Sequence, residues 1–109
     1  MVAFILLYRL KEGVTPEEFE QKFRSIHIPI AVTLPKLRRY NIGKGLRGPA
    51  GKGTKWYRAA YVEFDSVKDM EDMLVSPQWK ALVQDDEFNS RVEGGVGAFF
   101  EMEKVFEKK

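Results

Sequence analysis

The sequence contains no cysteine among its 109 residues and only one histidine, His27. The absence of cysteine excludes disulfides, thiolate nucleophiles and thiolate metal sites. With a single histidine and no cysteine, a zinc site would have only carboxylates as its other ligands. We therefore expect no bound metal. Nothing in the sequence indicates haem or another cofactor, and none is predicted.

Long hydrophobic runs are also missing. The longest, residues 2–8, is too short to cross a bilayer and lacks the basic segment and small-residue cleavage site of a secretory signal. We therefore expect no membrane association and a cytoplasmic location. A hydrophobic share of 44% is typical of a folded protein, and the length favours one domain over residues 1–109.

Acidic residues are missing from the segment between Glu20 and Glu63, which carries many lysines and arginines. The segregation is compatible with two solvated faces of opposite charge. Alternatively, it marks a patch for an anionic ligand, or complementary surfaces that meet in an oligomer. The net charge of +2 is too small to imply a nucleic-acid partner, so we expect none.

The first half of the chain has the pattern of strand, helix, strand. Residues 2–10 are mainly β-branched, aromatic and apolar, which predicts a strand. Thr15 and Pro16, followed by Glu18, predict the N-cap and first turn of a helix. Pro29 predicts a kink or restart near residues 27–29, and the helix should end by residues 34–35. A second strand is expected at residues 37–42.

The second half repeats this pattern after a glycine-rich basic loop at residues 43–55. The loop contains a formal GxGxxG, but a strand and not a helix follows it, so no phosphate site is predicted. A strand is expected at residues 56–65, helices capped by Ser66 and Ser76, and a last strand at residues 96–106. The order βαββαβ predicts an α+β, ferredoxin-like fold with a four-stranded antiparallel sheet and helices on one face.

The strands are apolar on both faces, although helices can cover only one. Alternation places Val2, Phe4, Leu6 and Tyr8 of the first strand on one face, and Ala3, Ile5 and Leu7 on the other. An exposed apolar sheet face favours aggregation unless another surface buries it. We therefore expect a homodimer in which two sheets stack as a dimeric α/β barrel.

His27 is the residue to which the sequence assigns chemistry. Its reference pKa of about 6.5 suits a proton donor or acceptor near neutral pH. Alternatively, it satisfies a backbone carbonyl at the kink. Inward aromatic side chains would line an apolar cavity with polar groups, the usual composition of a small-molecule site, although core packing explains each of them equally. The candidate ligand-binding residues are Tyr8, Arg39, Tyr40, Trp56 and Tyr61.

The N-terminal half resembles the EthD family of dimeric α/β-barrel proteins, named for a role in ethyl tert-butyl ether degradation. The resemblance rests on Leu7-Tyr8-Arg9, Thr15-Pro16-Glu17-Glu18-Phe19, His27-Ile28-Pro29-Ile30 and the turn from Leu34 to Tyr40. In the second half, Ser76-Pro77-x-Trp79 is similar to the family's second helix. Ile30 replaces the family's leucine, and Lys36 replaces its usual glycine.

The resemblance implies the fold, the dimer and His27 as the pocket residue. From it we expect a protein that binds a small apolar or aromatic metabolite and assists its oxidation or degradation without a bound metal. The alternative is a non-catalytic accessory or binding module that acts through its dimeric barrel. The sequence does not decide whether the protein is an enzyme, since this fold supports many kinds of chemistry.

Overall fold

Four strands form one antiparallel sheet in the computed structural model, which describes residues 1–109. They are β1 (Val2–Leu10), β2 (Arg39–Gly43), β3 (Arg58–Phe64) and β4 (Val92–Glu101), and their order across the sheet is β2-β3-β1-β4. The two central strands, β1 and β3, pair with Val2 opposite Phe64 and Tyr8 opposite Arg58.

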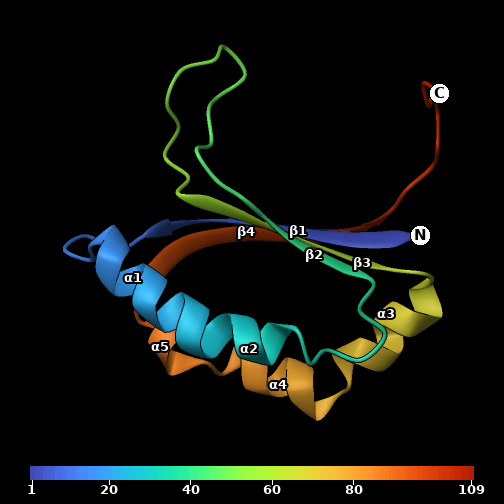
Figure 1. Ribbon diagram of the computed structural model, residues 1–109, viewed down its shortest axis with the longest axis horizontal. Helices are drawn as coiled ribbons and strands as arrows, with labels where there is room; N and C mark the ends of the chain where they lie inside the picture. Colours follow the sequence, from blue (N-terminus) through green and yellow to red (C-terminus); the bar gives the residue numbers. More distant parts are fainter.

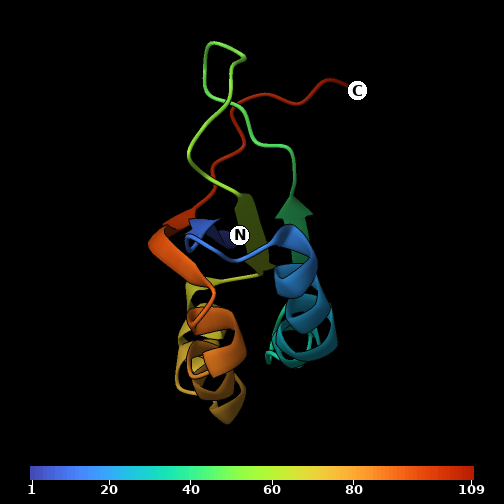
Figure 2. The ribbon, with the colours of Figure 1, turned by 90° about the vertical axis from the view of Figure 1, so that its left-hand side faces the viewer.

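All helices lie on one face of this sheet, in two groups that run side by side (Figures 1 and 2). The first group contains α1 (Pro16–Lys22), η1 (Phe23–His27) and α2 (Ile28–Ala31). The second group contains α3 (Val67–Leu74), α4 (Pro77–Val83) and α5 (Asp86–Asn89). This arrangement confirms the predicted ferredoxin-like fold. None of the helices has both the length and the apolar character needed to cross a membrane.

Side-chain caps begin the helices where the sequence predicts them. The Thr15 hydroxyl accepts a hydrogen bond from the Glu18 amide, at the start of α1. Ser66 and Ser76 cap α3 and α4 in the same way, each accepting from the amide three residues later. Each cap satisfies a first-turn amide that has no partner inside its helix.

The expected kink before Pro29 takes the form of a π-helical turn. η1 continues α1 directly and passes into α2, so the backbone is helical from Pro16 to Ala31. The wider turn accommodates Pro29, which provides no amide hydrogen for the helix. The last residue of this turn is His27, and the π-helical segment therefore sets the direction of its side chain.

Three strand boundaries differ from the predictions. β2 covers 39–43 and not 37–42, and β3 covers 58–64 and not 56–65. β4 begins at Val92 and ends at Glu101, whereas the sequence predicts residues 96–106 because the glycines were expected to interrupt the strand. At Gly97 a Cβ would lie 2.9 Å from the ring of Phe4, so a glycine there gives the ring its space. In addition, the short helix α5 is not predicted from the sequence.

The core consists of two separate hydrophobic clusters. One contains Leu34, Val62, Phe64 and Met73, near α3. The other contains Tyr8, Phe19 and Phe23, under α1 and η1. The two clusters occupy opposite ends of the layer between the sheet and the helices, and the space between them becomes the candidate site.

The opposite face of the sheet is uncovered and partly apolar. Ile5, Val96, Phe100 and Met102 expose between 37% and 58% of their surface. The loop between β2 and β3 and the C-terminal segment both extend from the sheet away from the helices (Figures 1 and 2). The loop therefore does not lie over the space between sheet and helices.

Candidate functional site

A cavity of about 240 Å³ lies between the two core clusters. Eleven of its 13 lining residues are hydrophobic, and the other two are His27 and Asn89. The Asn89 amide already donates to the carbonyl oxygen of Val83 at 2.9 Å. Of the two titratable side chains in the lining, His27 and Tyr40, the histidine is the one suited to proton transfer near neutral pH.

The cavity has the sheet as its floor and helices as its walls. Leu6 of β1 and Ala60 of β3, which pair across the two central strands, form part of the floor. Trp79 of α4 and Phe88 of α5 contribute aromatic walls. Apolar protein cavities of about 150 Å³ admit benzene, so this cavity has room for a compound with about two rings.

Asp85 fixes the orientation of the His27 ring. His27 Nδ1 lies 2.9 Å from Asp85 Oδ2, and both side chains are largely buried. The imidazole also stacks on the ring of Phe88, with centroids 4.0 Å apart, and more distantly on Phe23. Since Nδ1 is occupied by the carboxylate, the ring nitrogen left for a ligand is Nε2.

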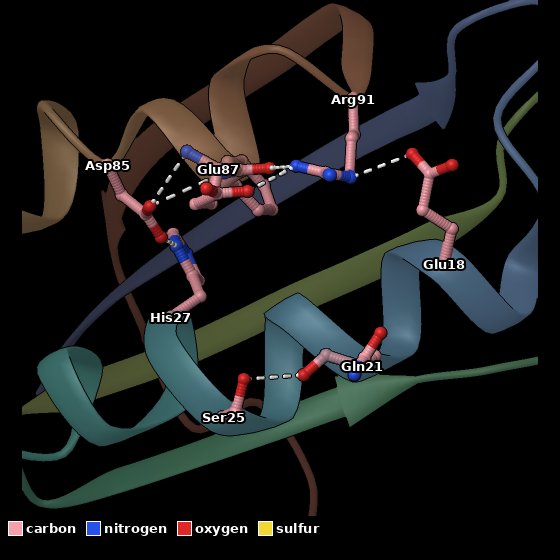
Figure 3. A network of polar contacts seen from close by, with 8 residues as sticks. Glu18, Gln21, Ser25, His27, Asp85, Glu87 and Arg91 are labelled. Atoms are coloured by element: carbon pink, nitrogen blue, oxygen red, sulfur yellow. Dashed lines mark hydrogen bonds and ion pairs between the residues drawn. The ribbon is translucent and has the colours of Figure 1, made fainter.

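Asp85 is itself held in place by α5. Its Oδ1 accepts hydrogen bonds from the amides of Glu87 and Phe88, at 3.1 and 3.4 Å, and so caps this short helix. Arg91 forms ion pairs with Glu87 and with Glu18 of α1 (Figure 3). The network connects the two helix groups and fixes the carboxylate that orients His27.

Burial lowers the pKa of His27, and the hydrogen bond and charge of Asp85 offset only part of this effect. The imidazole is therefore neutral near neutral pH. A neutral ring that donates its Nδ1 hydrogen to Asp85 presents an unprotonated Nε2. This arrangement suits a general base.

His27 and Tyr40 are the two predicted site residues that line the cavity. Burial raises the pKa of Tyr40 to about 12, so its hydroxyl stays protonated. Tyr8 lies outside the lining, in the core cluster under α1, and is 2% exposed. Trp56 also lies outside it, before β3, with the Lys55 ammonium 4.8 Å from its ring centroid.

Arg39 and Tyr61 lie on the uncovered face of the sheet, away from the cavity. The Tyr61 hydroxyl donates to Glu63 at 2.7 Å, and Arg39 forms an ion pair with the same carboxylate. Alternation along β3 explains this placement, because Ala60 and Val62 occupy the cavity side.

Two polar residues that the sequence did not single out have central positions. Asp85 lies 58 residues from His27, and a single sequence contains no signal for that pairing. Arg58, by contrast, could have been found, since alternation places it on the same face of β3 as Ala60. It is only 5% exposed.

Arg58 belongs to a buried polar group next to the cavity. Its Nη2 donates to Glu20 of α1 and to the Tyr57 hydroxyl. Tyr8 lies directly opposite Arg58 in the pairing of β1 with β3. The Tyr8 hydroxyl and the Nε and Nη1 atoms of Arg58 are buried without a hydrogen-bond partner in the protein.

The structure contains no group of three or more His, Asp or Glu side chains arranged to bind a metal ion. The acidic side chains described above are instead engaged with Arg39, Arg58, Arg91 or His27. The chain's own residues thus provide an oriented imidazole, a buried guanidinium and several hydroxyls.

A family model described as REDY-like protein HapK matches residues 2–105 of the chain. The chain belongs to the HapK family. The predicted resemblance to EthD proteins is therefore confirmed for the fold but not for the family. No curated protein matches the sequence of this HapK-family chain significantly.

Solved structures share the fold over nearly the whole HapK-family chain. An EthD family protein from Bacillus halodurans has a TM-score of 0.76 and 20% identity, covering 94% of this chain and 99% of its own. Hydroxynitrile lyase from Passiflora edulis has a TM-score of 0.75 and 21% identity, with coverage of 97% and 96%. A dimeric ferredoxin-like protein of unknown function from Bacteroides fragilis has a TM-score of 0.66 and 22% identity, with coverage of 93% and 95%.

Proposed function

We propose that this protein binds a small apolar or aromatic compound in the cavity and that His27 exchanges a proton with it. The observation that carries the proposal is the His27–Asp85 pair at the wall of an otherwise apolar space. Apolar walls with a few fixed polar groups are the usual composition of small-molecule sites.

His27 Nε2 would remove a proton from a carbon or hydroxyl of the bound compound. The proton moves to the imidazole, the electron pair remains on the substrate as an enolate or alkoxide, and Asp85 stabilises the imidazolium that forms. Such an anion can undergo bond cleavage, or it can be oxidised by dissolved O₂, which takes up its electrons. His27 would in this way assist the degradation or oxidation of an apolar metabolite.

A neutral two-ring ketone, β-tetralone, provides a test that does not require the natural substrate. Its acidic C–H bonds exchange with D₂O when a base removes the proton and a deuteron returns. We expect the protein to bind β-tetralone and to accelerate this exchange at pH 7 beyond the protein-free rate. His27→Gln should keep binding but lose about 10²–10⁴-fold in exchange rate, the usual contribution of a general base.

Asp85→Asn serves as the companion variant, because asparagine can still cap α5. It should fold and bind the ketone, with a reduced exchange rate caused by loss of the carboxylate that orients the ring. A surface variant, Asp72→Asn, removes an exposed carboxylate of α3 and should match the unmodified protein. Equal exchange rates in the protein and in His27→Gln would overturn the catalytic assignment.

A non-catalytic binding module is the second candidate, and the low polarity of the cavity favours it. Apart from Asn89, whose amide is engaged, only His27, Tyr40 and Trp79 bring side-chain polar atoms to the wall, which is few for a reaction site. In that case β-tetralone binds without accelerated exchange. Mass spectrometry of compounds that copurify with the protein then identifies the cargo directly.

We also infer that the protein works as a homodimer through the uncovered sheet face. Ile5, Val96 and Phe100 on this face would be buried against a second copy. Burial of such side chains contributes roughly 1.5–3 kcal/mol each before the cost of association. The protein from B. fragilis, described as dimeric, supports this inference by its similar fold.

A further inference from the structure

The buried group around Arg58 has no place in the proton transfer, yet it lies at the end of the cavity. On the helix side of the sheet, Leu6 and Ala60 pair with each other and form cavity floor. Tyr8 and Arg58 are the next pair on the same face of the same strands. Two residues along a strand span roughly 7 Å, about the length of one aromatic ring and its substituent.

Tyr40 connects the cavity with this group. It lines the cavity, and the charge of Arg58 lowers the pKa of Tyr40 against the larger, opposite effect of burial. Tyr40 pairs with Val62, two residues from Ala60 on the side away from Arg58. A ligand that lies over Leu6 and Ala60 therefore has Tyr40 on one side and the pair of Tyr8 and Arg58 on the other.

The free polar atoms of the group are all hydrogen-bond donors. Arg58 has unpaired Nε–H and Nη1–H groups, and its guanidinium is permanently charged. Burial raises the pKa of Tyr8 and raises that of Tyr40 to about 12, so both hydroxyls remain protonated. Donor groups from an arginine and two tyrosines fit an acceptor oxygen, and the guanidinium repels a cation.

The charge of the group is also unbalanced. Glu20 accepts from both Arg58 and Arg24, and these hydrogen bonds lower its pKa against the opposing effect of burial. One carboxylate thus faces two guanidinium groups, the buried one of Arg58 and the mostly exposed one of Arg24. The rings of Phe23 and Tyr57 lie beside the Arg58 guanidinium, with centroids 5.6 and 4.9 Å from its central carbon, and exclude water from it.

We propose that Arg58, Tyr8 and Tyr40 form a carboxylate subsite and that the ligand of this protein is an aromatic or apolar carboxylic acid. The acid's ring system fills the cavity beside His27, and its carboxylate pairs with the unpaired donors of Arg58. The inference rests on the proposed small-molecule function and adds the ligand's charge to it. It also gives the basic segment of the sequence a specific purpose at Arg24 and Arg58.

Two probes of equal size test the subsite. 2-Naphthoate has a carboxylate, and naphthalene-2-carboxamide replaces it by a neutral amide. We expect 2-naphthoate to bind at least tenfold more tightly in calorimetric titration at pH 7. Arg58→Gln should remove this preference while the amide still binds. Arg38→Gln, which alters an exposed ion pair with Asp65, should keep it.

Tyr8→Phe provides a second variant that preserves folding, since it removes only a hydroxyl without a hydrogen-bond partner. It should weaken 2-naphthoate several-fold and leave the amide unchanged. Equal affinities of the two probes for the unmodified protein would overturn the subsite and leave the proposed function intact. If neither these probes nor β-tetralone bind, the proposed function itself fails.

Discussion

Lys36 has a backbone conformation that few side chains adopt. Its φ is 67°, in the left-handed region, whereas the four other positive φ angles of the chain belong to glycines. The residue lies in the turn before β2, where the EthD pattern has glycine. A lysine there carries strain between its Cβ and the backbone that glycine would not.

Lys36→Gly should therefore stabilise the protein by about 0.5–1 kcal/mol, since relief of the left-handed strain exceeds glycine's greater unfolded-state entropy. The measurement is the urea midpoint at constant slope. Lys36→Ala removes the same side-chain charge but retains a Cβ, and it should give no gain. A gain of equal size in both variants would assign the effect to charge and not to backbone conformation.

The lowered pKa of His27 also has a consequence for stability. The unfolded chain, with a histidine pKa of about 6.5, binds a proton more readily than the folded protein does. The stabilising contribution is therefore present above about pH 6.5 and is lost as the pH falls through the lower folded-state pKa. Urea unfolding between pH 5 and 8 should show a steeper decrease for the protein than for His27→Gln. Parallel curves would contradict the assignment of a buried, neutral imidazole.

At the level of elements, the caps made the helices predictable from sequence. Thr15, Ser66 and Ser76 act within three residues of themselves, and such local contacts are visible in the order of residue types. The pairing of His27 with Asp85 is not local. It depends on how the two helix groups pack against each other over the sheet, and this packing cannot be predicted from a single sequence.

The last strand shows why glycine misled the prediction of its boundaries. Glycine usually weakens a strand, but β4 includes three of them between Val92 and Glu101. Gly97 is explained by the Phe4 ring, which occupies the space of a side chain. A register shift opposite Leu7 and Arg9 accounts for the irregular start of the pairing. Both features of β4 result from contacts with β1. These contacts are tertiary, so the local sequence of β4 does not predict them.

Gly97→Ala should thus destabilise the protein by roughly 1–3 kcal/mol, the usual cost of overpacking. The new methyl group would lie 2.9 Å from the Phe4 ring, which already packs against Trp79 and Phe99. Gly53→Ala is the matched control, because a Cβ there meets nothing within 4 Å. Thermal unfolding of the two variants should separate them by several degrees.

At the level of the whole molecule, the uncovered face predicts the behaviour of the protein in solution. Phe100→Asp places a charge in the proposed interface, and the protein should then scatter light as a single chain at micromolar concentration. Val75→Asp introduces the same charge at a residue of the helix side that is 86% exposed, and the dimer should remain. A single chain already in the unmodified protein would contradict the dimer and leave the cavity unaffected.

The division of the core into two clusters has a consequence for the way the molecule opens. One cluster lies under α1 and the other near α3, with the cavity between them, so each end can exchange its amide hydrogens in a separate opening event. A bound compound touches residues that pack against both clusters and merges the two ends into one cooperative unit. Hydrogen exchange in α1 and α3 should therefore differ in the free protein and converge when the ligand is bound.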